Sequence, residues 1–372
     1  MPPEPVPDVG AGLSRAPDSP RIGGRPRDLG GTLARLALAA AWSARHPLEP
    51  FAASPAEAPP ERYYYRAEDG WESPLFRRPP PPGASGEPVL LAHGLAQGAR
   101  SFDFLDQGSL ASALHAAGFD VYVLSHRGDR GAVAPATGRG FDFDDIVSED
   151  VPAALACVRR VSGFERALWV GHSMGGQLLY AHAARGGGSE IAAGVTLCSA
   201  VRFPQPTSQV RLAALTARLL PEGWSLPTRL VQGALSAVAD PAMWASVARD
   251  MDGSVARGVM LHAGEDVPIG LVRQVARWLS AGSLCDRHDR LDYLAGLQGL
   301  ALPIMAVAAR GDQVCAPEQA RPALDALDPA CTRWLCLGEG WAHLDPLLGR
   351  QAGAEVFPEV VAWLDRWRKD CW

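Results

Sequence analysis

The sequence lacks a hydrophobic run of membrane-spanning length, because no stretch of its 372 residues approaches the roughly twenty apolar residues that such a helix requires. It also lacks a strong charge of either sign, and the mild formal net charge of −6 argues against nucleic acid as a partner. Seven cysteines, an odd number without a compact framework, do not indicate a disulfide-stabilised scaffold. With 47% hydrophobic residues, the chain can instead bury a large core.

Metal and cofactor motifs are absent as well. The segment Cys-Asp-Arg-His at 285–288 contains potential ligands, but no second ligand pair lies near it, and closed zinc sites normally require four ligands. Cys198 ends one apolar run and Cys336 lies within another, so we expect most of the cysteines to be buried thiols. We therefore predict no metal and no cofactor.

Residues 1–60 differ from the rest of the chain in their many prolines, and we predict that this segment is disordered. Within it, 29–44 has the composition of a short helix, which can be read as a late signal peptide or as a helix that packs on the domain or against a surface. Arg35 interrupts the apolar run, and the preceding region is long and not simply basic, which disfavours a signal peptide. We expect a cytoplasmic protein rather than a secreted or membrane-surface one.

The most informative motif is Gly-His-Ser-Met-Gly at 171–175, which follows an apolar run and precedes a helix of small residues. Gly-x-Ser-x-Gly in this context is typical of a nucleophile elbow, in which a serine occupies a strained turn between a strand and a helix. The glycines at 171 and 175 leave room for that turn, where side chains would clash. Ser173 is therefore the candidate nucleophile.

A serine hydroxyl needs a base, and the base needs an orienting carboxylate. Asp312 ends the segment 302–312, an apolar run that closes in Gly-Asp, and His343 follows the next strand-like run, 333–338. An ordinary turn aspartate and an ordinary loop histidine are the alternative for each residue alone. Their order after Ser173, each behind its own strand, favours a catalytic triad.

Backbone amides near the serine are the expected oxyanion hole. The apolar strand 88–92 ends in His93-Gly94, and we predict that the N–H groups of Leu95 and Met174 face the developing oxyanion. Main-chain donors perform this task, so the side chains there carry little information. We expect His93 to fix the loop rather than to take part in the chemistry.

These motifs resemble the α/β-hydrolase superfamily over roughly residues 85–370. More narrowly, Gly-Phe-Asp-Val-Tyr-Val-Leu-Ser-His-Arg-Gly at 118–128 and Asp-Val-Pro-Ala-Ala at 150–154 are similar to segments of the acid-lipase group. The C-terminal segment that begins with His-Leu-Asp at 343–345 resembles both acid lipases and polyhydroxyalkanoate synthases. Those synthases use a cysteine nucleophile, so the serine at 173 favours ester hydrolysis over polymer synthesis.

The fold class that we predict is α/β, an α/β-hydrolase fold with a mostly parallel sheet covered on both faces and a helical cap insertion. Its core comprises 61–199 and 302–372, and it begins with a β-hairpin at 62–78 around Asp69-Gly70. The cap comprises 200–301, which is far longer than one crossover helix needs. We expect its tryptophans and methionines to form the cap's own core, or in part to line an apolar substrate pocket.

Acidic residues cluster at 142–149, with Asp103 and Asp106 further upstream, and we interpret them as solvated carboxylates, several of them near helix starts.

Three functional hypotheses remain. The first is a serine hydrolase of carboxylic esters with apolar acyl groups, acting on a small-molecule ester or lipid-like substrate through an acyl-enzyme. The second is an acyltransferase or thioesterase with the same triad, and the third is a non-catalytic ligand-binding protein.

Overall fold

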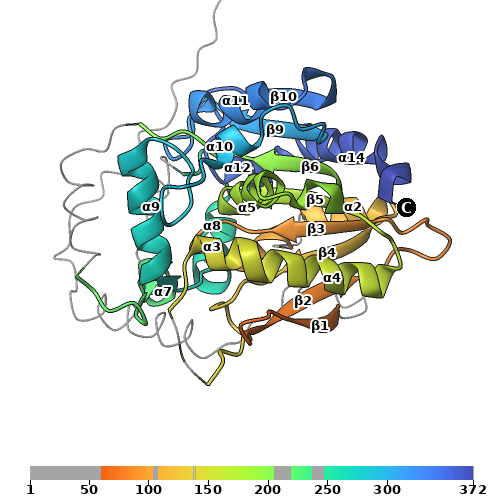
Figure 1. Ribbon diagram of the computed structural model, residues 1–372. Coiled ribbons are helices and arrows are strands. Elements are labelled where there is room, and N and C mark those ends of the chain that lie inside the picture. The colour runs from red at the N-terminus through yellow and green to blue at the C-terminus, as the bar shows by residue number, and fades with distance from the viewer. Residues whose placement is uncertain are drawn as a thin grey trace, which may run out of the picture.

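A twisted sheet of mostly parallel strands forms the centre of the computed structural model, which describes residues 60–103, 108–136, 138, 140–204, 219–236 and 247–371. Within these residues the sheet has eight strands in the order β1-β2-β4-β3-β5-β6-β9-β10 (Figure 1). The six strands from β4 to β10 pair in parallel. The bounds are β1 (Glu61–Arg66), β2 (Glu72–Arg78), β3 (Pro88–Ala92), β4 (Asp120–Leu124), β5 (Ala167–His172), β6 (Ile191–Leu197), β9 (Ile304–Ala309) and β10 (Thr332–Leu337).

Helices cover both faces of this sheet, which is why its central strands are apolar throughout. Along β3, Val89 and Leu91 pack into the core beneath α2 and α14, whereas Leu90 and Ala92 pack into the core beneath α4 and α5. The predicted α/β class, with a mostly parallel sheet covered on both faces, is confirmed. The helices outside the cap are α2 (Leu110–Ala116), α3 (Phe143–Asp145), α4 (Val151–Ser162), α5 (Met174–Ala184), α11 (Pro317–Ala326), α12 (Asp345–Leu348), α13 (Ala352–Glu355) and α14 (Phe357–Asp365).

Shorter helical segments complete the core. The 3₁₀ segments are η1 (Ala99–Phe102), η3 (Gly187–Glu190), η5 (Pro329–Cys331) and η6 (Arg368–Cys371), and one π-helical turn, η2 (Ile146–Asp150), joins α3 to α4. The β-hairpin expected at the start of the sheet is present. Strands β1 and β2 pair antiparallel, from Glu61 opposite Arg77 to Arg66 opposite Glu72, and β2 in turn pairs antiparallel with β4.

Additional elements lie between β6 and β9, where we predicted a cap. They are β7 (Ser225–Leu226), α7 (Thr228–Ser236), α8 (Gly253–His262), β8 (Val267–Pro268), α9 (Ile269–Ala281) and α10 (Tyr293–Gly296). Helices α7 and α9 lie at one end of the sheet, on the left of Figure 1, away from the C-terminus. Met260 and Trp278 are buried, but Trp278 packs against Phe143 of the core, with ring centroids 4.8 Å apart, rather than in a core of the cap's own, and Trp224 is exposed. The domain boundaries at 200 and 301 stay a prediction.

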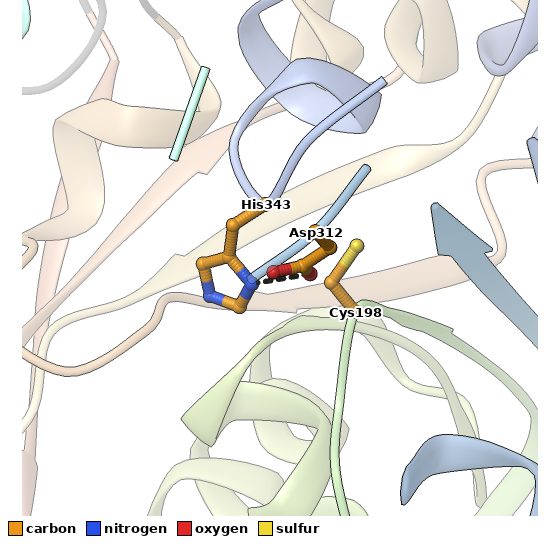
Figure 2. A group of neighbouring side chains, drawn as sticks. All are labelled: Cys198, Asp312 and His343. Carbon is orange, nitrogen blue, oxygen red and sulfur yellow. Dashed lines mark hydrogen bonds and ion pairs between the residues drawn. The ribbon is translucent and has the colours of Figure 1, made fainter. Parts of the chain in front are cut away.

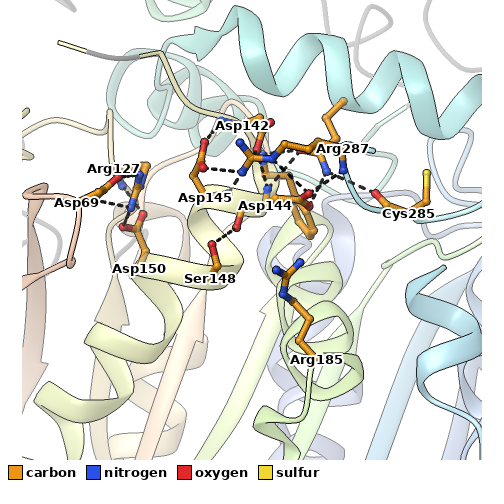
Figure 3. A network of polar contacts seen from close by, with 12 residues as sticks. Asp69, Arg127, Asp142, Asp144, Asp145, Ser148, Asp150, Arg185, Cys285 and Arg287 are labelled. Carbon is orange, nitrogen blue, oxygen red and sulfur yellow. Dashed lines mark hydrogen bonds and ion pairs between the residues drawn. The ribbon is translucent and has the colours of Figure 1, made fainter. Parts of the chain in front are cut away.

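A polar network joins this cap segment to the core and corrects one expectation (Figure 3). Asp144 is buried, not solvated, and its carboxylate accepts hydrogen bonds of 2.7 Å from Gln274 Nε2, from the Tyr293 hydroxyl and from the Arg287 amide. A carboxylate at the start of a helix also stabilises that helix, and Asp142 caps α3 in the expected way. Sequence could not show that α9 and α10 fold over this helix start.

Of Asp103, Asp106 and the segment 1–59, the structure describes only Asp103. Asp103 is buried and accepts a hydrogen bond of 2.9 Å from the Ser109 hydroxyl. The interpretation of Asp103 as a solvated carboxylate is therefore wrong, as it is for Asp144. Asp106 and the segment 1–59, including the helix expected at 29–44, lie outside the described residues. In the part of the chain that the structure describes, no helix is both long and apolar enough to cross a membrane.

Candidate active site

Ser173 occupies the turn between β5 and α5, with a backbone φ of 51° and ψ of −114°. L-residues rarely adopt positive φ, so the turn is strained, as a nucleophile elbow requires. A Cβ at position 175 would overlap with the carbonyl of Ala92, and one at position 171 would overlap with the backbone of residues 175 and 176. The glycines are therefore needed sterically, and the turn holds Ser173 at the carboxyl end of β5.

Asp312 and His343 meet at the same edge of the sheet (Figure 2). His343 Nδ1 donates a hydrogen bond of 2.7 Å to Asp312 Oδ2. The other carboxylate oxygen accepts from the amides of Val314 at 2.7 Å and Cys315 at 2.8 Å. Burial alone would raise the pKa of Asp312, but these hydrogen bonds and the proximity of His343 hold that pKa below its ordinary value. The carboxylate is thus ionised and orients the imidazole.

The structure brings Ser173 to this pair only indirectly. Among the described residues, no hydrogen bond joins Ser173 to His343. Its neighbour His172 does make contact, since the His172 ring centroid lies 4.9 Å from that of His343 and its Nε2 donates to the His343 carbonyl at 3.0 Å. Catalytic hydrogen bonds are often loose in unliganded enzymes. The geometry thus contains the His343–Asp312 hydrogen bond of a triad but not the one to Ser173, and the triad assignment stays a prediction.

His172 is a positioning residue that we did not anticipate from the sequence. Burial lowers its pKa to about 3, so the ring is neutral at ordinary pH. Its Nδ1 lies 3.1 Å from Gln97 Oε1, and a 180° rotation of that amide would present a donor to this nitrogen. The ring therefore connects the loop after β3 to the loop that carries His343.

A second anchor of the His343 loop is Asp345, whose role was also not anticipated. Its buried carboxylate accepts hydrogen bonds from the amides of Ala342 at 2.7 Å, Arg249 at 2.8 Å and Asp250 at 3.1 Å. The Leu344 amide also donates to the Val247 carbonyl at 2.8 Å. Residues 247–250 and 342–345, which are distant in sequence, are thereby held together. The sequence offered only one indication of this anchor, an aspartate two residues after His343.

The predicted oxyanion donors, Leu95 and Met174, line one small cavity together. In the described part of the chain, no hydrogen bond engages either amide, as a free oxyanion hole would require. Gly94 brings the two loops together, since a Cβ there would lie 3.1 Å from the Ser173 Cβ. As expected, His93 fixes this loop: its ring nitrogens lie 3.0 Å from the Gly94 carbonyl oxygen and 2.8 Å from Asp129 Oδ2.

Cys198, at the end of β6, completes the surroundings of the Asp312–His343 pair (Figure 2). One ligand-type atom from each of these three residues lies within 4.8 Å of the others, so thiol, carboxylate and imidazole form a set that could hold a metal ion. However, burial raises the pKa of the Cys198 thiol well above its ordinary value, and His343 Nδ1 is already engaged by Asp312. The arrangement therefore suits proton transfer better than metal binding.

Residues 87–345 match the model of the alpha/beta hydrolase fold family, so the chain belongs to that family. This confirms the resemblance to the superfamily.

Curated relatives match a shorter region. Over 130 residues the chain is 32% identical to lipase member M of Homo sapiens, covering 32% of this chain and 31% of the relative. Over 95 residues it is 35% identical to a putative lysosomal acid lipase/cholesteryl ester hydrolase of Crotalus adamanteus, covering 23% and 24%. The match thus spans about a third or less of the length of these relatives.

Solved structures resemble the fold over more of the chain. An esterase, RhEst1, of Rhodococcus sp. ECU1013 superposes with a TM-score of 0.54 at 17% identity, covering 84% of this chain and 99% of that one. A monoacylglycerol lipase of Paleococcus ferrophilus superposes with a TM-score of 0.56 at 18% identity, covering 78% and 98%. At such identities the similarity concerns the fold.

Proposed function

We propose that the protein is a serine hydrolase that cleaves carboxylic esters with apolar acyl groups through an acyl-enzyme. The observation that carries the proposal is the hydrogen bond of 2.7 Å between His343 and the ionised Asp312, at the sheet edge where Ser173 occupies a strained turn. Lipases and esterases among the relatives and structural neighbours support ester hydrolysis. The triad chemistry is our inference from the residues themselves.

The proposed mechanism assigns one role to each group. Ser173 attacks the acyl carbonyl carbon while His343 accepts the serine proton at Nε2, and Asp312 stabilises the resulting imidazolium. The amides of Leu95 and Met174 stabilise the oxyanion. His343 then returns the proton to the leaving alcohol, and a water molecule, activated by the same histidine, releases the acid from the serine.

Apolar acyl groups are suggested by the side chains near the oxyanion donors, not by the volume of the cavity there, which is about 20 Å³ and too small for an acyl chain. Core and cap both contribute apolar side chains to it, namely Leu95, Ile146, Met174, Pro268 and Leu271. Ester-binding sites are mostly apolar with a few placed polar groups, which fits this lining.

The test is hydrolysis of p-nitrophenyl esters from acetate to palmitate by the wild type and by Ser173→Ala. We expect turnover by the wild type and a loss of several powers of ten in Ser173→Ala, with folding unchanged. Mass spectrometry after treatment with a fluorophosphonate should place the label on Ser173.

Each alternative hypothesis has its own result in this experiment. An acyltransferase or thioesterase would label at Ser173 but transfer the acyl group to added alcohols, or cleave thioesters in preference to esters. A ligand-binding protein would show neither label nor turnover. Esterase activity that persists in Ser173→Ala would overturn the proposal.

A further inference from the structure

The cavity that Leu95 and Met174 line has a polar side as well as an apolar one. His93, His126, Asp129 and Glu265 contribute to its wall. All four side chains are largely buried, and His93 and His126 are only 1% and 2% exposed. An apolar acyl chain has no use for such groups, so they call for a physical explanation.

His93 is the positively charged member of this group. Its Nδ1 lies 3.0 Å from the Gly94 carbonyl oxygen and its Nε2 lies 2.8 Å from Asp129 Oδ2, so both ring nitrogens face acceptors and both carry protons. Burial would lower the pKa of His93, but the Asp129 carboxylate raises it above the ordinary value. The pair is therefore an imidazolium and a carboxylate, and its hydrogen bonds are satisfied internally.

His126 differs, because neither of its ring nitrogens makes a hydrogen bond of normal geometry among the described residues, although the backbone of His93 lies close enough to favour the protonated ring. Its ring lies 4.1 Å from that of His93, centroid to centroid. Burial, followed by the charge of His93, lowers the pKa of His126 to about 3, so the ring is neutral. A neutral imidazole offers one donor and one acceptor. Leaving both unsatisfied in a buried site is costly unless a ligand uses them.

The charges around His126 limit what this ligand can be. The wall carries charges of both signs, because Asp129 and Asp266 disfavour an anion, whereas the His93 imidazolium and Arg127 disfavour a cation. Burial, followed by the charge of Asp129, raises the pKa of Glu265 to about 7, so its carboxyl group is only partly ionised. The free space is about 20 Å³, room for one small polar group but not for a chain. A hydroxyl group, which both donates and accepts, matches the neutral imidazole, the charges and the size.

We propose that this cavity is a subsite for a hydroxyl group on the acyl part of the ester, close to the carbonyl carbon, with His126 as the residue that determines this specificity. The inference rests on the proposed function. The position of the cavity supports it, because Gly94, Leu95 and Met174, which line it, are the immediate neighbours of Ser173 and of the oxyanion site.

The experiment compares kcat/KM for p-nitrophenyl butyrate with that for its 2-hydroxy and 3-hydroxy derivatives. The wild type should favour one hydroxy ester by about tenfold, the worth of one neutral hydrogen bond. His126→Phe should abolish that ratio, and His126→Asn, which keeps a donor and an acceptor, should retain part of it. The matched control is His182→Phe, which removes a buried histidine bonded to Glu190 at the far end of α5 and should leave the ratio unchanged.

Binding gives a readout that does not depend on turnover. Saturation-transfer NMR of Ser173→Ala should detect methyl hydroxybutyrate more strongly than methyl butyrate, and the difference should vanish in Ser173→Ala/His126→Phe. Discrimination in binding without turnover in the wild type would support the subsite and contradict the proposed hydrolase. Turnover of all esters with equal ratios in the wild type and His126→Phe would overturn the subsite and leave the hydrolase intact.

Discussion

Two buried histidine–aspartate pairs lie on loops at the same edge of the sheet, and their hydrogen bonds are almost equal in length. His343 Nδ1 and Asp312 Oδ2 are 2.7 Å apart, and His93 Nε2 and Asp129 Oδ2 are 2.8 Å apart. The difference lies in the other nitrogen of each ring. His93 Nδ1 donates to the Gly94 carbonyl, whereas in the described residues His343 Nε2 has no partner.

A histidine can act as a general base only if one nitrogen is free to accept a proton. His343 has such a nitrogen, and its carboxylate partner fixes the tautomer that leaves it free. Both nitrogens of His93 are protonated and engaged, so that ring holds the loop after β3 in place. Similar distances thus suit the proposed catalytic role in one pair and a stabilising role in the other, and variants of the two aspartates should separate these roles.

The largest effect is expected from Asp312→Asn. The amide would donate to His343 Nδ1 and force the proton onto Nε2, so that the ring could no longer accept the serine proton. We expect kcat to fall by roughly 10⁴-fold, with little change in the urea midpoint. Steady-state hydrolysis of p-nitrophenyl butyrate measures this effect. A loss below tenfold in a folded protein would contradict the role assigned to Asp312.

Asp129→Asn should have the opposite profile. It would deprive the buried His93 imidazolium of its ion-pair partner, and breaking a buried pair in this way costs about 3–5 kcal/mol. Equilibrium urea unfolding should show that loss in the free energy of unfolding. Activity per folded molecule should fall far less than in Asp312→Asn. If the stability loss were below about 1 kcal/mol, His93 would have to be neutral in the wild type.

Sequence pointed to Asp312 and His343, whose hydrogen bond the structure shows, and to a loop-fixing role for His93, but not to Asp129 as the partner of His93. Asp312 and His343 each follow an apolar strand, in the order after Ser173 that is typical of α/β-hydrolases, so both could be proposed from the sequence. His126 and Asp129 lie in an irregular loop after β4, where no periodicity indicates which side chains turn inward. The same holds for Asp144, since its burial depends on how the segment after β6 folds over α3.

A smaller effect concerns pH and the neutral ring beside His93. Burial lowers the pKa of His126 to about 3, below its value in the unfolded chain, so the unfolded state alone takes up this proton as the pH falls below about 6.5. His126 therefore makes the protein less stable toward acid. As the pH falls from 6.5 to 5, the free energy of unfolding of His126→Phe should rise relative to that of the wild type by up to about 1.4 kcal/mol for each pH unit. Urea unfolding at several pH values measures it, and a difference independent of pH would show that His126 is charged when folded.

The smallest effect should come from Gln97→Met, which tests how far His343 depends on its neighbours. The variant keeps the volume of the side chain but removes the partner of His172 Nδ1, which lies 3.1 Å away. His172 would still donate to the His343 carbonyl, so we expect a loss of about 1 kcal/mol in the free energy of unfolding. The kcat should fall a few-fold, because a looser His172 lets the His343 loop deviate from the geometry that Asp312 imposes. A change in KM alone would instead mean that Gln97 acts through the cavity it lines.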